Sequence, residues 1–184
     1  ASARIFNSQG NDKRCSQALA AAEKVWNESR APLTADNKLA FAKTYAELGH
    51  TFKAENILEQ LVMENTDDEE FLAKIDQIVE NPISKKGKEI AQKAIKTGIG
   101  FYNKQDYAAA IKEFNSAIRL YPKHLGIKLN LIQALLLSYQ ENPTTKDAYE
   151  RGLKHLNQLG NMSPEHEQYQ RYVKIKAKFD QVKL

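Results

Sequence analysis

Helix-length amphipathic segments recur along the whole of this 184-residue chain, and a turn or helix-stop signal closes each one. Within a segment, apolar residues return at steps of three and four, the spacing of one helical face. No stretch alternates with period two for long enough to predict a strand. The low number of breakers, 8 Gly and 5 Pro, agrees with this pattern. The sequence therefore predicts an all-α fold. The stop signals are Gly49, Asn81-Pro82, Pro122, Asn142-Pro143 and Gly160.

Capping signals place the ends of about nine predicted helices. Thr66 and Glu69 have the spacing of a capping box, and Ser84 is an N-cap candidate for the helix after it. Ser163 followed by Pro164 predicts the start of the last helix, because proline is favoured at the first helical position. The predicted helices cover approximately 12–28, 35–48, 51–64, 66–80, 84–104, 106–121, 125–140, 144–160 and 163–184.

Residues 91–124 carry a spaced set of small and aromatic side chains. Gly98 is followed by Phe101, and twelve residues after Gly98 comes Ala110; Phe114, Ala117 and Pro122 complete the set. This pattern resembles the tetratricopeptide repeat (TPR), a helical hairpin of 34 residues. The resemblance implies that Gly98 packs against Ala110 where two helices cross. It also implies a right-handed solenoid of stacked hairpins within one domain spanning 1–184. Its expected parts are a truncated repeat at 1–30, a repeat at 35–68, an extra helix at 67–80, the best-matching repeat at 84–124, a degenerate repeat at 125–160 and a C-terminal helix at 163–184.

The stretch from Asn81-Pro82 to Tyr121-Pro122 and onward to Leu135 resembles the TPR-bearing region of some bacterial two-component response regulators. The resemblance implies an output or scaffold part of a bacterial signalling protein in the cytoplasm. A single cysteine, Cys15, agrees with a reducing compartment. No apolar run reaches the roughly 20 residues that span a bilayer, so we expect no membrane segment.

Residues typical of catalysis or metal binding are scattered. No pair among His50, His124, His155 and His166 has the spacing of a helical zinc site. His50 lies in a turn and His124 follows a helix stop, so both are expected to be solvated loop residues. Cys15 lies on an apolar stripe and is expected to be a small core residue. We therefore expect neither an enzyme nor a cofactor or metal.

The TPR resemblance implies a concave groove that binds a peptide or helix of a protein partner through the first helix of each repeat. The expected partner-binding residues are Lys43, Lys96, Ile99, Tyr102, Asn103, Asn130 and Gln133. They do not match the Lys/Asn/Arg set with which some TPR domains bind a C-terminal carboxylate.

Charge is divided unevenly along the chain. Residues 1–82 contain 9 basic and 14 acidic side chains, and residues 83–184 contain 18 basic and 9 acidic ones. Opposite ends of neighbouring copies could attract, so weak, salt-sensitive self-association is expected. The less favoured alternative function is electrostatic nucleic-acid binding by the basic half. Its candidate residues are Lys85, Lys86, Lys88, Lys93, Lys96, Tyr169, Arg171, Tyr172, Lys174, Lys176 and Lys178.

Overall fold

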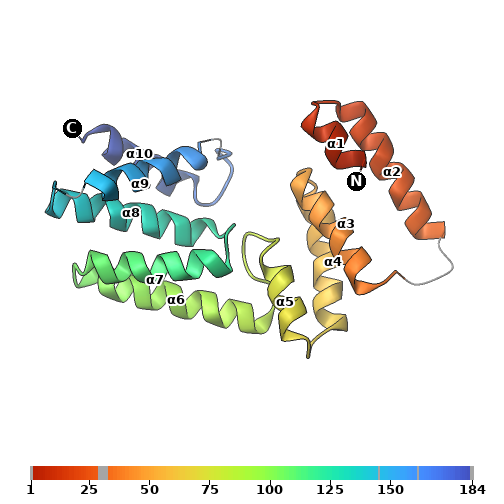
Figure 1. The fold of residues 1–184 in the computed structure, drawn as a ribbon, viewed down its shortest axis with the longest axis horizontal. Coiled ribbons are helices and arrows are strands. Elements are labelled where there is room, and N and C mark those ends of the chain that lie inside the picture. The colour runs from red at the N-terminus through yellow and green to blue at the C-terminus, as the bar shows by residue number, and fades with distance from the viewer. Residues whose placement is uncertain (1, 29–32, 145, 161, 183–184) are drawn as a thin grey trace. The chain divides into compact units, whose positions relative to one another are not determined.

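The computed structural model describes residues 2–28, 33–144, 146–160 and 162–182 (Figure 1). About three quarters of the protein is helical and the described residues contain no strand, which confirms the all-α prediction. Ten helices are present in this part of the chain. They are α1 (Ser2–Ser8), α2 (Asp12–Glu28), α3 (Ala35–Glu47), α4 (Thr51–Glu64), α5 (Glu69–Asp76), α6 (Lys85–Asn103), α7 (Tyr107–Leu120), α8 (Leu125–Glu141), α9 (Lys146–Gln158) and α10 (Tyr169–Asp180).

The helices form two compact units, Ala1–Val79 and Glu80–Leu184. In the first unit, α1 packs with α2 and α3 packs with α4, while α1 also contacts α3 and α5 contacts α4. Its core includes Cys15, as expected from the sequence, together with Tyr45 and Ala54. Trp26 of α2 meets Phe41 of α3 edge to face, with ring centroids 4.6 Å apart.

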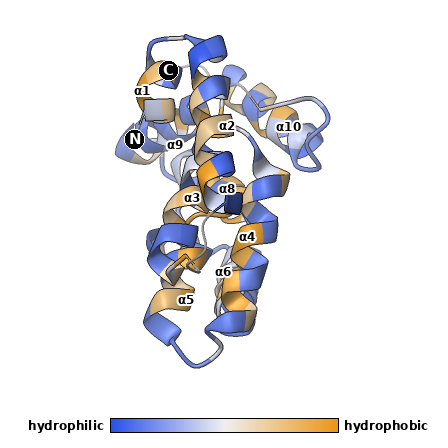
Figure 2. Ribbon diagram, turned by 90° about the vertical axis from the view of Figure 1, so that its right-hand side faces the viewer, coloured by the Kyte–Doolittle hydropathy of each residue, from blue (hydrophilic) through white to orange (hydrophobic). Residues whose placement is uncertain are grey.

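The second unit is built around α8. This helix contacts α6, α7, α9 and α10, and α6 also pairs with α7. Because neighbours cover α8 on all sides, its apolar residues do not form a single stripe. In contrast, hydrophobic and hydrophilic bands follow one another along α4 of the first unit (Figure 2). The contacts of α8 with both α6 and α10 are consistent with a helical repeat, while the right-handed solenoid and the single 1–184 domain stay predictions.

Side-chain caps fix several helix starts. Thr34, Ser84 and Asp106 each accept a hydrogen bond from a backbone N–H three residues later, at 3.3, 2.9 and 3.0 Å. Such caps satisfy donors that have no partner within the helix. They place the hairpins α3–α4 and α6–α7 where the sequence predicted them.

The start and the end of α5 and the start of α10 were predicted wrongly. Asp68, and not Thr66, caps α5 by accepting from Phe71 N at 2.9 Å, and the helix ends at Asp76. Three possible capping acceptors, Thr66, Asp67 and Asp68, follow one another there, and the sequence pattern does not choose among them. Ser163 accepts from Glu165 N in a turn, so α10 begins at Tyr169. The short α1 adds a tenth helix that the 12–28 stripe did not indicate.

Gly98 lets α6 and α7 approach closely, but the side chain that it faces is Phe114. A Cβ atom at Gly98 would lie 2.3 Å from Cε1 of Phe114, a ring that is only 1% exposed. The three atoms nearest to that Cβ all belong to Phe114, while packing of Gly98 against Ala110 stays a prediction. The small residue therefore makes room for an aromatic ring of the paired helix.

Candidate functional site

A pocket of about 200 Å³ lies in the second unit, where side chains of α6, α8 and α10 converge. They are the first, third and fifth helices of the second unit. In a repeat of helical hairpins these would be the first helices of successive hairpins, which lie on one face. Phe114 of α7 also contributes to the wall. The lining residues are Ile99, Tyr102, Asn103, Phe114, Asn130, Gln133 and Arg171.

A hydrogen-bond network joins the three helices across the pocket. Gln133 Nε2 on α8 donates to the hydroxyl oxygen of Tyr102 on α6 at 2.8 Å. Arg171 Nη2 on α10 donates to Gln133 Oε1 at 3.3 Å and to Asn130 Oδ1. An arginine side chain has donors only, so it fixes which end of each amide faces it. Both amide oxygens are therefore directed at the guanidinium.

Burial sets the electrostatics of the pocket. Burial lowers the pKa of the half-buried Arg171, and the effect of Tyr102 opposes that shift. Burial also raises the pKa of Tyr102, with a further increase from Tyr107, although Gln133 and Arg171 act in the opposite direction. A guanidinium stays protonated in proteins even when its pKa falls. At neutral pH the pocket thus contains one cation beside a neutral phenol.

The structure brings five of the seven predicted binding residues together in this pocket: Ile99, Tyr102, Asn103, Asn130 and Gln133. Lys96 lies on α6 one turn before Ile99; it is exposed and does not line the pocket. Lys43 is exposed on α3 in the first unit.

Arg171 was missed as a member of this pocket, because the sequence placed it among the basic residues of the nucleic-acid alternative. The available signal was its place in α10 directly before Tyr172, a residue of the apolar stripe. A long polar side chain beside such a stripe often lies along the core with its charged head at the edge. Its contact with α8 depends on packing between distant parts of the chain, which the local pattern does not contain.

Two histidines outside the pocket, His166 and His124, are partly buried. His166 Nε2 lies 3.0 Å from Glu80 Oε2, and its Nδ1 accepts from Gln168 N. His124 was expected to be solvated, but its side chain is half-buried and its Nδ1 has no hydrogen-bond partner among the described residues. Burial lowers the pKa of His124, and Glu80 opposes this shift.

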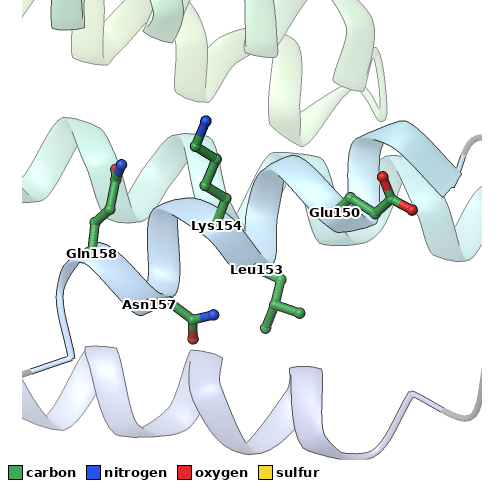
Figure 3. A pocket seen from close by; sticks show the side chains of 5 residues that line it. All are labelled: Glu150, Leu153, Lys154, Asn157 and Gln158. Atoms are coloured by element: carbon green, nitrogen blue, oxygen red, sulfur yellow. The ribbon is translucent and has the colours of Figure 1, made fainter.

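Two further recesses are present. One, of about 500 Å³, runs along α9 alone; Leu153 and Asn157 project on one side of the helix, and Lys154 and Gln158 on the other (Figure 3). The second, of about 360 Å³, lies in the first unit and is almost entirely apolar. Its walls come from α2, α3 and Leu33. Neither recess joins polar groups of several helices in a shared network.

In comparisons with family models, with curated proteins and with solved structures, nothing matches this chain. Among the residues that the structure describes, no helix has both the length and the apolar character needed to cross a membrane. The same residues contain no group of three or more His, Cys, Asp or Glu side chains placed to hold a metal ion.

Proposed function

We propose that this protein is a non-catalytic interaction module that binds a peptide or helix of a protein partner on the face formed by α6, α8 and α10. The observation that carries the proposal is the network linking Tyr102, Gln133 and Arg171 across these three helices. Residues on neighbouring elements are pre-positioned beside an open pocket, and pre-positioning reduces the ordering cost of binding.

The chemistry of the pocket favours binding over catalysis. A general acid or base works best when its pKa lies near the working pH. The phenol of Tyr102 has a raised pKa, and the guanidinium of Arg171 remains charged despite its lowered pKa. Neither group exchanges a proton readily at neutral pH, whereas both can form hydrogen bonds with a ligand.

The resemblance of 91–124 to a TPR supports a more specific form of this proposal. In that form the chain is a TPR-like scaffold, the output part of a cytoplasmic bacterial two-component signalling protein. Support comes from the Gly98–Phe114 packing and from the contacts of α6 with α8 and of α8 with α10, which suit stacked hairpins.

A selection from a random peptide display library on the immobilised full chain tests the binding function. Ile99→Asn should weaken the binding of the recovered peptides at least tenfold, because Ile99 lines the pocket and is 39% exposed. Leu120→Asn is the matched control, since Leu120 is a similarly exposed apolar residue of α7 that does not line the pocket. Fluorescence anisotropy measures both.

Equal affinities for the wild type and Ile99→Asn would exclude this face as the binding site. The nucleic-acid alternative is examined with a single-stranded oligonucleotide probe at rising salt. A tight complex that weakens steeply with salt, while no peptide is recovered, would favour that alternative, because phosphate contacts release counterions.

A further inference from the structure

We propose that the pocket of α6, α8 and α10 receives the side-chain carboxylate of an aspartate or glutamate in the bound peptide, with Arg171 as its principal contact. This inference rests on the proposed function and specifies the chemistry of its ligand. It follows from the balance of donors and acceptors, from charge and from the available space.

Acceptors in the pocket are largely consumed by its own network. Gln133 Oε1 and Asn130 Oδ1 both receive the Nη2 group of Arg171, and the hydroxyl oxygen of Tyr102 receives Gln133 Nε2. Apart from the exposed amide oxygen of Asn103, this arrangement leaves few acceptors in the pocket for a ligand's donors. It disfavours ligands that present ammonium or guanidinium groups.

Donors, in contrast, remain available. Within the described residues, Nη1 and Nε of Arg171 have no hydrogen-bond partner, and neither does Nδ2 of Asn130. Asn130 is only 9% exposed and lines the pocket. The Tyr102 hydroxyl can also donate, because its single printed bond uses it as an acceptor. A ligand that fits must therefore bring acceptors.

Charge points to an anionic acceptor. No acidic side chain lines the pocket, and the groups bonded to Arg171 are two neutral amides. A half-buried cation loses part of its hydration, and an anion offsets this loss more strongly than a neutral acceptor does. A carboxylate accepts charge-assisted hydrogen bonds from a guanidinium, so the unpaired Nη1 or Nε group of Arg171 can hold one of its oxygens.

The size and walls of the pocket suit one acidic side chain. Its volume of about 200 Å³ is at the scale of a single residue, well below the roughly 300–1,000 Å³ of small-molecule sites. Ile99 and Phe114 provide apolar surface for the methylene groups that carry the carboxylate. The peptide backbone would remain outside, along the face of the three helices.

The test uses the ¹⁵N-labelled full chain at about 0.15 M salt and a probe with both backbone ends blocked, N-acetyl-glutamate α-amide. Its neutral counterpart is N-acetyl-glutamine α-amide, and inorganic phosphate is the third arm. We expect the glutamate probe to shift the Arg171 Nε–H and Asn130 amide signals and to bind at least tenfold more tightly than the glutamine probe. This comparison needs no variant.

Arg171→Gln should weaken binding of the glutamate probe at least tenfold. Lys174→Gln, which removes the same charge from an exposed position one turn away on α10, should change it less than twofold. The inference is overturned if both probes bind equally, if Lys174→Gln has the larger effect, or if phosphate alone shifts the pocket signals.

The two proposals fail differently. Selected peptides that depend on Ile99 but contain no acidic residue would overturn the carboxylate inference and leave the binding function standing. A glutamate probe that binds while the library yields no peptide would contradict the peptide-binding function instead.

Discussion

Gly98→Ala should destabilise the second unit through one added methyl group. The new Cβ would lie 2.3, 2.6 and 2.9 Å from three ring atoms of Phe114. Carbon atoms in contact normally stay about 3.5–4.0 Å apart, so the ring or the helix must move by more than an ångström. Phe114 is 1% exposed and has core neighbours around it, and overpacking of this kind costs about 1–3 kcal/mol.

Helix propensity acts in the opposite direction, which makes a control essential. Alanine is better than glycine inside a helix by about 1 kcal/mol. Gly100 lies on the same helix, and a Cβ there would meet nothing within 4 Å. Gly100→Ala should therefore stabilise by about 0.5–1 kcal/mol. The difference between the two variants isolates the steric term, which we expect to be about 1–3 kcal/mol.

Urea unfolding followed by far-ultraviolet circular dichroism measures both variants. Fluorescence of the single tryptophan, Trp26, reports on the first unit and separates its transition from that of the second. A double variant with Phe114→Leu should recover part of the loss, because the shorter side chain makes room. The reasoning is refuted if Gly98→Ala is as stable as Gly100→Ala.

Three further predictions concern caps and titration. Asp68→Ala should lower the free energy of unfolding by about 1 kcal/mol in urea denaturation because Phe71 N loses its acceptor, whereas Thr66→Ala should change it by less than about 0.5 kcal/mol. In the folded protein the pKa of His124 is below its usual 6.5, so the unfolded chain binds the proton more readily and the free energy of unfolding should fall from pH 7 to pH 5. His124→Gln should reduce this pH dependence, as measured by urea titrations at both pH values. Burial and the Glu23 hydrogen bond raise the pKa of Tyr45 above 10, so the first unit should lose stability above pH 10. Tyr45→Phe should remove that loss, and Trp26 fluorescence measures both proteins.

Local patterns were sufficient for most of the helices. Ser84 and Asp106 cap α6 and α7 as their sequence neighbours indicate, since an N-cap bond spans only three residues. The same locality explains the errors at Thr66 and Ser163, where a nearby acceptor or a turn competes with the predicted cap. Ends of helices are decided by small energy differences of this kind.

The candidate site was predictable only in part. The TPR resemblance implied that Tyr102, Asn103, Asn130 and Gln133 lie on the groove side of the first helices of their repeats. Arg171 could not be assigned in this way, because its partner Asn130 lies 41 positions away and α10 follows a turn of unpredicted length. Side-chain contacts between non-adjacent helices depend on packing, which one sequence does not encode locally.

Phe114 belongs both to the core and to the wall of the pocket. Its ring occupies the space that the missing side chain of Gly98 leaves free. The packing of the core and the shape of the proposed binding pocket are therefore coupled at these two positions, and a substitution at either one alters both. Asn103 is exposed and lines the same pocket, so a substitution there changes the pocket with little effect on core packing.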